Sequence, residues 1–119
     1  MKWAEYKNNV KIVLDKLEID NEILNLLKES KNKGNKIFIA GNGGSGATAA
    51  HYSCDFSLGA SKPDYLNNWD RFNVIPLTTN MPLILALAND FGYDEIFKQQ
   101  LINLAKPEDI LIAISGSGN

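Results

Sequence analysis

A glycine-rich turn behind a short apolar run constrains the fold of this chain more than any other feature. Residues 36–40 (KIFIA) are rich in β-formers, residues 41–46 (GNGGSG) form the turn, and residues 47–50 (ATAA) favour a helix. This order predicts a strand, a tight loop and a helix. Backbone N–H groups converge at the start of such a helix and favour an anion. A plain turn is the alternative, but it seldom needs four glycines within six residues. We therefore expect a phosphate cradle.

Residues 1–34 have the apolar spacing of two helices. The second helix follows a cap at Asp20-Asn21 and ends at Lys33-Gly34. The first carries an apolar stripe, which either docks on another subunit or packs on the chain's own sheet. The members of the stripe are Trp3, Tyr6, Val10, Val13, Leu14 and Leu17.

Strand and helix patterns alternate after residue 35. The spacing predicts strands at 36–40, 72–78 and 110–114, helices at about 45–57, 80–88 and 94–105, and a loop over 58–70. Pro76 places the second strand at a sheet edge or near a strand end. Continuously apolar strands between helices predict an α/β fold, a three-layer sandwich with a parallel sheet flanked by helices. We expect one domain over 1–119, with a helical segment at 1–34 and a sheet core at 35–119.

The last two helices have specific expected ends and faces. Asn80 is expected to start the first of them, and residues 89–92 to end it. The inward face of the second is expected to consist of Ile96, Phe97, Leu101, Leu104 and Ala105.

Composition narrows the class of protein. A chain of 119 residues with 45% hydrophobic and 22% charged residues is typical of one globular domain. The net charge of −2 provides no basic face, so we expect no nucleic-acid partner. The apolar runs, such as the one at 110–114, are too short to span a membrane. The N-terminus has no secretory pattern and Cys54 is the single cysteine, so we expect a cytoplasmic location.

A second small-residue loop, Ser115-Gly116-Ser117-Gly118, follows the third strand. Ligands of open α/β sheets bind beyond the carboxyl ends of the strands, so the two loops meet if their strands are neighbours. The hydroxyls of Ser115 and Ser117 can donate to phosphate or sugar oxygens, although serine loops are also plain connectors. Because such a loop normally leads into another helix, we expect the natural chain to continue past Asn119.

Two other phosphate-binding patterns fit less well. Gly41, Gly43 and Gly46 match the dinucleotide fingerprint G-x-G-x-x-G, which also needs an acidic residue at the end of the next strand. That strand ends in residues 77–79 (LTT), which disfavours a dinucleotide. A P-loop is excluded because no Gly-Lys-Ser/Thr follows the glycines.

The helix after the glycine loop carries the one histidine, His51, with Asp55 four residues later. An i, i+4 pair lies on one helix face, where imidazole and carboxylate can converge on one proton or one metal ion. An ordinary exposed pair is the alternative, but a helix that opens at a phosphate cradle favours a pair within reach of a bound phosphosugar. We expect Cys54 to be a small core residue rather than a nucleophile.

Four further residues could serve a sugar phosphate or have a structural role. Asn89 and Asp90 could bind sugar hydroxyls, and a carboxylate there can equally cap the following helix. Lys62 and Arg71 flank the long loop and could lend charge to a phosphate or remain solvated.

With these residues in place, the chain resembles the sugar isomerase (SIS) domain family, in particular its phosphoheptose isomerase type. The motifs stand in that family's order: GNGGS at 41–45, His51, ANDFGY at 88–93 and AISGSGN at 113–119. The resemblance implies a parallel sheet flanked by helices and a homotetramer with active sites at subunit interfaces. It also implies interconversion of sedoheptulose 7-phosphate and glycero-manno-heptose 7-phosphate through an enediol, towards heptose for surface polysaccharide. The rival expectation is a non-catalytic SIS domain that binds a phosphosugar or a protein partner.

The resemblance also implies roles for individual residues. His51 and Asp55 would be the catalytic pair and ligands of one zinc ion, although the family normally has glutamate where this chain has the shorter Asp55. The remaining ligands, a distal glutamine and histidine, are expected beyond Asn119, so residues 1–119 alone are expected to be inactive. The implied substrate contacts are Asn42, Gly43, Gly44, Ser45, Asp55, Asn89, Asp90, Ser115, Gly116 and Ser117.

Overall fold

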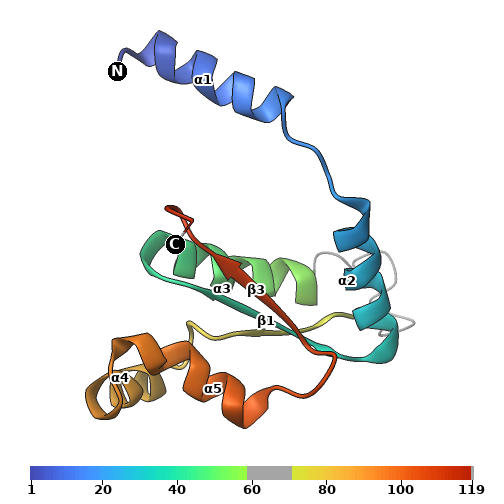
Figure 1. The fold of residues 1–119 in the computed structure, drawn as a ribbon, viewed down its shortest axis with the longest axis vertical. Coiled ribbons are helices and arrows are strands. Elements are labelled where there is room, and N and C mark those ends of the chain that lie inside the picture. The colour runs from blue at the N-terminus through green and yellow to red at the C-terminus, as the bar shows by residue number, and fades with distance from the viewer. Residues whose placement is uncertain (59–70, 119) are drawn as a thin grey trace.

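The computed structural model describes residues 1–58 and 71–118, which form helices around a parallel sheet (Figure 1). The elements are α1 (Trp3–Asp15), α2 (Asn21–Lys33), β1 (Lys36–Gly41), α3 (Gly43–Ser57), β2 (Asn73–Pro76), α4 (Met81–Asp90), a 3-10 turn (Tyr93–Glu95), α5 (Ile96–Leu104) and β3 (Ile110–Ile114). The loop predicted over 58–70, including Lys62, lies from residue 59 onward outside the described residues. No helix within the described ranges is long and apolar enough to cross a membrane.

The sheet has the strand order β2-β1-β3, and both pairings are parallel. Ile37 of β1 lies opposite Val74 of β2 on one side and Ile110 of β3 on the other. Pro76 is the last residue of the edge strand β2, where its missing N–H breaks no ladder bond. The predicted α/β class and parallel sheet are therefore confirmed.

The central strand β1 is buried on both faces, which makes three layers. Ile37 and Ile39 pack with Ala49 of α3 on one face. On the other face Phe38 packs with Leu77, and Phe97 of α5 lies against this cluster. Figure 1 shows α3 on one side of the sheet and α4 and α5 on the other. Burial of each large β1 side chain stabilises the fold by about 1.5–3 kcal/mol.

The helices have the predicted caps, but two of them differ in length from the prediction. Asp20 caps α2 by accepting from the N–H of Glu22, and Gly34 ends this helix at φ 71°. Asn80 starts α4 as predicted, accepting from the N–H of Leu83. However, α4 continues through Asp90 instead of ending at Ala88, and α3 begins at Gly43, inside the glycine turn.

The predictions of burial for α5 and for β3 were wrong. In α5, Leu104 and Ala105 are exposed, while the polar Gln100 is buried and donates to the carbonyls of Leu77 and Ile96. In β3, Leu111 is 49% exposed, so this strand is not covered on both faces. The reason is that α5 packs over the cluster around Phe38 in β1, which leaves one face of the outer strand open.

Helix α1 forms as predicted, but no residue of it is buried. Residues 16–20 carry it away from the sheet (Figure 1). Its apolar stripe is exposed, with Trp3 at 75% and Leu14 at 62%. The stripe therefore does not pack on the chain's own sheet, which was one of the two alternatives.

Candidate functional site

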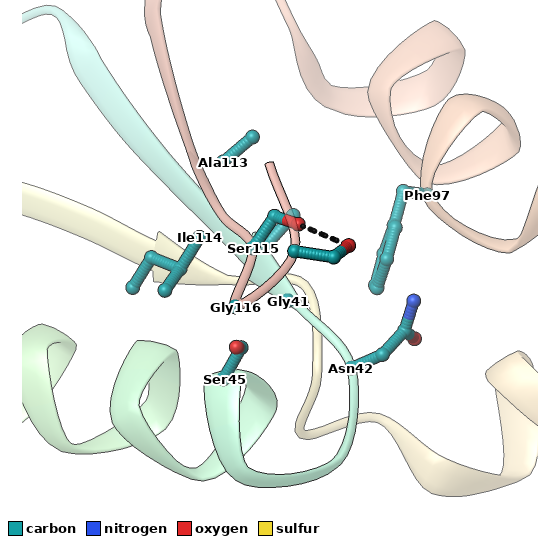
Figure 2. Close-up of a pocket in the computed structure, with 10 residues that line it drawn as sticks. Gly41, Asn42, Ser45, Phe97, Ala113, Ile114, Ser115 and Gly116 are labelled. Atoms are coloured by element: carbon teal, nitrogen blue, oxygen red, sulfur yellow. Dashed lines mark hydrogen bonds between the residues drawn. The ribbon is translucent and has the colours of Figure 1, made fainter. Parts of the chain in front are cut away.

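The glycine loop and the serine loop lie side by side because β1 and β3 are neighbours. The register pairs Gly41, the last residue of β1, with Ile114, the last residue of β3. Between the loops lies a cavity of about 430 Å³ (Figure 2), a size typical of small-molecule sites. It is lined by Ala40, Gly41, Asn42, Ser45, Phe97, Ala113, Ile114, Ser115, Gly116 and Ser117. The meeting of the two loops that the sequence predicted is thus observed.

Two of the four glycines are needed for close packing of the turn itself. A Cβ on Gly41 would lie 2.7 Å from the backbone of Ser45, and one on Gly46 would lie 2.8 Å from the carbonyl oxygen of Gly41. By contrast, a Cβ on Gly43 or Gly44 would meet no atom within 4 Å, although Gly43 has φ 53°. Packing of the turn therefore explains the glycines at positions 41 and 46. It does not explain Gly43 and Gly44, which have open space around them.

The first turn of α3 begins beside this cavity, which Asn42 and Ser45 line, whereas Gly43 lines a second cavity between α3 and α4 and Gly44 lines neither of the two. The first helical bond is donated by the N–H of Gly46 to the carbonyl of Asn42, at 3.1 Å. The N–H groups of the preceding residues 43–45 have no acceptor within the helix. Asn42 is extended (φ −112°, ψ 150°), and its side chain does not cap the helix. This end of α3 can therefore accept an anion.

The serine loop adds hydroxyl groups on the opposite wall. The Oγ atoms of Ser115 and Ser117 lie 3.4 Å apart (Figure 2), and the N–H of Gly118 donates to Ser115 Oγ at 3.0 Å. This turn orients both hydroxyls along the cavity wall. A phosphate oxygen in the cavity could therefore take hydrogen bonds from both loops.

His51 and Asp55 form the expected pair on α3 but do not line the cavity. The Nε2 atom of His51 lies 3.5 Å from Oδ2 of Asp55, and the side chains are 77% and 58% exposed. At 1.5 Å per residue, Asp55 lies about 18 Å beyond Gly43 along the helix. That exceeds the span of a seven-carbon sugar phosphate. Within one copy of the chain, α3 therefore separates the pair from the cradle.

The surroundings of this pair differ from the prediction in one respect. Cys54 was expected in the core, but it is exposed. The sheet-facing side of α3 is instead formed by Gly46 and Ala49, which are buried. No cluster of three histidine, cysteine, aspartate or glutamate side chains suited to a metal occurs in the described ranges.

Asn89 and Asp90 also lie outside the cavity, at the end of α4. The amide of Asn89 donates to Asp90 Oδ1 at 2.9 Å, and both residues are exposed. Asp90 does not cap the following helix, because the 3-10 turn begins after Gly92 with no side-chain cap. Arg71 is half-buried at the start of β2, the end of the sheet opposite the cradle. It therefore cannot lend charge to a phosphate there.

Sequence reasoning gave no site role to two aromatic residues. Phe97 of α5 forms one wall of the cavity (Figure 2). Tyr93 donates from its hydroxyl to Oδ1 of Asn42, at 2.8 Å. Phe97 was predicted to face inward, and Tyr93 belongs to the ANDFGY motif, so the signals were present without a reason to link them to the site.

The SIS domain family profile matches residues 5–119, so this chain belongs to the SIS domain family.

Two relatives and one solved structure that match this chain are described as phosphoheptose isomerases, one of them as probable. The phosphoheptose isomerase of Shewanella sp. (strain ANA-3) is 43% identical over 90 residues, which are 72% of this chain and 41% of the relative. The probable phosphoheptose isomerase of Thermoplasma acidophilum is 37% identical over 97 residues, covering 82% of this chain and 50% of the relative. The structure of phosphoheptose isomerase GmhA from Neisseria gonorrhoeae matches with a TM-score of 0.79 and 28% identity, over 98% of this chain and 59% of that one. The chain thus spans about half the length of the curated relatives it matches.

Proposed function

We propose that the protein is a phosphoheptose isomerase, which interconverts sedoheptulose 7-phosphate and glycero-manno-heptose 7-phosphate. The observation that carries this proposal is the pair of loops around one cavity, with backbone N–H groups on one wall and the hydroxyls of Ser115 and Ser117 on the other. Such a cradle suits the phosphate of a phosphosugar. The names of the relatives support a phosphorylated heptose as the substrate, and a role in making heptose for surface polysaccharide is part of the proposal.

The proposed reaction moves one proton between adjacent carbons. A base removes the proton from the carbon beside the carbonyl while the carbonyl oxygen gains a proton, which gives an enediol. A proton is then added to the former carbonyl carbon, and the hydroxyl of the carbon that was first deprotonated loses its proton, so that the carbonyl now lies on that carbon. Asp55 is the proposed base and must come within about 2.6–3.2 Å of that proton. The cradle fixes the phosphate end and so presents the carbonyl end to the base.

We propose that the base and the cradle of one site come from different copies of the chain. The length of α3 supports this arrangement, since it separates Asp55 from the cradle within one copy. The exposed stripe of α1 supports a homo-oligomer, with a tetramer as the expected form. Its apolar side chains Val10, Val13 and Leu14 border an open groove of about 340 Å³. A second copy of α1 is the proposed occupant.

We propose zinc as the cofactor, held by His51 and Asp55. Their 3.5 Å separation is close to the roughly 3.4 Å between two ligands of a tetrahedral zinc with bonds of about 2.1 Å. Bound zinc would polarise the carbonyl of the sugar. Two donors do not complete a zinc site, so further ligands must come from outside this pair. His51→Ala should abolish zinc uptake in equilibrium dialysis, whereas Cys54→Ala should not.

Turnover of sedoheptulose 7-phosphate by the protein as its gene encodes it tests the proposal. Asp55→Asn keeps the shape of the side chain and should lower kcat by about 10²–10⁴-fold. Asp15→Asn, the same change at the exposed end of α1, should leave kcat unaltered. Binding of the phosphosugar without any turnover, with zinc supplied, would instead establish the non-catalytic binding domain. No binding at all would refute both functions.

A shared site has its own test. Asp55→Asn and Ser117→Asp, which places a negative charge in the cradle, should each be inactive. Co-expression of the two variants should restore activity if cradle and base come from different copies. A co-expressed pair that stays inactive while it assembles would contradict the shared site.

A further inference from the structure

Tyr93 holds one end of the Asn42 side chain. Its hydroxyl donates to Oδ1 of Asn42 at 2.8 Å, across 51 residues of sequence. Asn42 lines the cradle and also a second cavity of about 370 Å³ between α3 and α4, and Tyr93 lines only the second one. The tyrosine therefore reaches Asn42 from behind, without entering the cradle.

This contact decides which end of the amide meets a ligand. An asparagine amide has an oxygen that accepts and a nitrogen that donates two hydrogen bonds. With Oδ1 bonded to Tyr93, the nitrogen lies on the side of Phe97, another cradle residue (Figure 2). A phosphate accepts hydrogen bonds, so it is attracted by the nitrogen and repelled by the oxygen. The tyrosine hydroxyl is a better donor than acceptor, and it favours the orientation that suits an anion.

The backbone before Tyr93 is shaped for this contact. Gly92 has φ 107° and ψ 155°, a conformation open almost only to glycine. A Cβ on Gly92 would also lie 2.9 Å from Oδ1 of Asp94. The chain turns sharply at this glycine, between the end of α4 and the 3-10 turn that starts with Tyr93. The glycine thus allows the turn that brings the tyrosine ring back to Asn42.

We propose that Tyr93 is a positioning residue that holds the Asn42 amide with its nitrogen toward the phosphate of the substrate. The identity of the substrate rests on the proposed function, but the positioning itself requires only an anionic ligand in the cradle. The role is exerted through Asn42, and Tyr93 does not touch the ligand.

The test compares Tyr93→Phe, Asn42→Ala and the double variant. Tyr93→Phe removes one neutral hydrogen bond, so KM for sedoheptulose 7-phosphate and Kd for inorganic phosphate should rise about 3- to 10-fold. The Asn42 amide is proposed to bind the phosphate equally in the ground state and in the transition state. We therefore expect kcat to change less than about twofold. In the Asn42→Ala background, Tyr93→Phe should have no further effect on either constant. Tyr52→Phe is the matched control, since the Tyr52 hydroxyl has no hydrogen-bond partner in the described part of the chain.

Two outcomes overturn the proposal. One is an unchanged KM and Kd in Tyr93→Phe, and the other is an equal rise in both backgrounds, which would mean that Tyr93 acts independently of Asn42. If the unmutated protein neither turns over nor binds the sugar phosphate, the proposed function fails separately. The side-chain amide resonances of Asn42 then decide the positioning, because Tyr93→Phe should shift them in the ligand-free protein and Tyr52→Phe should not. Unshifted resonances would refute it.

Discussion

Replacement of Asp109 by asparagine should destabilise the fold at the end of the sheet opposite the cradle. The carboxylate, only 7% exposed, joins the start of β1 to the turn before β3. Its Oδ1 accepts from the N–H of Lys36 at 2.7 Å, and its Oδ2 accepts from the N–H of Lys106 at 2.8 Å. The ammonium of Lys36 lies 3.4 Å from Oδ2. One side chain therefore satisfies two backbone donors and one cation.

The magnitude follows from what asparagine can replace. Its single carbonyl oxygen can keep one of the two backbone bonds of Asp109, and its NH₂ group then faces the other N–H, donor against donor. A hydrogen bond to a charged group is worth about 1.5–3 kcal/mol, and the contact with Lys36 adds to it. We expect Asp109→Asn to lower the free energy of unfolding by about 2–4 kcal/mol at pH 7. For a chain of this size the corresponding fall in Tm is roughly 8–20 °C.

The difference in Tm between Asp109→Asn and the unmutated protein should depend on pH. Burial raises the pKa of Asp109, but the N–H groups of Lys36 and Lys106 and the Lys36 ammonium outweigh it and hold the pKa below its ordinary value. A lowered folded-state pKa gives stability that is complete above the unfolded value, about 3.9, and is lost as the pH falls through the folded value. The gap in Tm should therefore stay constant from pH 7 to about 5 and shrink below about 4.

Thermal unfolding followed by circular dichroism between pH 3 and pH 7 measures both effects. Glu108→Gln is the control. The carboxylate of Glu108 is 66% exposed, so the Tm of this variant should differ little from that of the unmutated protein. Equal Tm values for Asp109→Asn and the unmutated protein at pH 7 would refute the hydrogen-bond argument. A gap that persists undiminished at pH 3 would refute the assignment of the effect to the charge.

Three further outcomes can be measured. Gly41→Ala should lower the free energy of unfolding by about 1–3 kcal/mol through overpacking, and it should weaken phosphate binding in calorimetry. Gly44→Ala, with open space around the residue, should leave the Tm unchanged. Equal Tm values for the two variants would contradict the close contact at Gly41. Asn80→Ala should cost about 1 kcal/mol in urea unfolding through loss of the α4 cap, and no loss would mean that water replaces it. Val13→Glu should dissociate the oligomer in sedimentation velocity, and an unaltered assembly would exclude the α1 stripe as the interface.

The sequence predicted the order and type of the elements because each has a strong local signal. The caps at Asp20 and Asn80 and the left-handed Gly34 depend only on neighbouring residues, and all three are observed. Which face of an element is covered depends on distant helices. The continuous apolarity of β3 therefore could not show that Leu111 is open to solvent. The burial of Gln100 was not predictable either, because its amide donates both to the carbonyl of Ile96 in its own helix and to that of the distant Leu77.

The parts of the candidate site that follow from the strand order were predictable, and those that depend on distant packing were not. Loops that follow neighbouring parallel strands must share an edge, so the meeting of Asn42 and Ser117 could be predicted once the strands were placed. The distance from the cradle to Asp55 follows from the helix rise, but it becomes decisive only when α3 is known to run unbroken to Ser57. The link between Tyr93 and Asn42 could not be predicted, because Tyr93 does not follow a strand and its position depends on the turn at Gly92 after α4.

The geometry of the cradle is set by the register of β1 on β3, which is fixed at both ends of the strand. At the amino end, Asp109 accepts from the first N–H of β1, and at the carboxyl end Gly41 pairs with Ile114 of β3 and packs on Ser45 at the turn into α3. A slip of one residue would move Ile37 and Ile39 out of their buried cluster and would also displace the glycine loop along the serine loop. The burial that stabilises the sheet thus holds the donors of both loops around the same cavity. Substitutions at Asp109 should therefore weaken phosphate binding from the far end of the sheet.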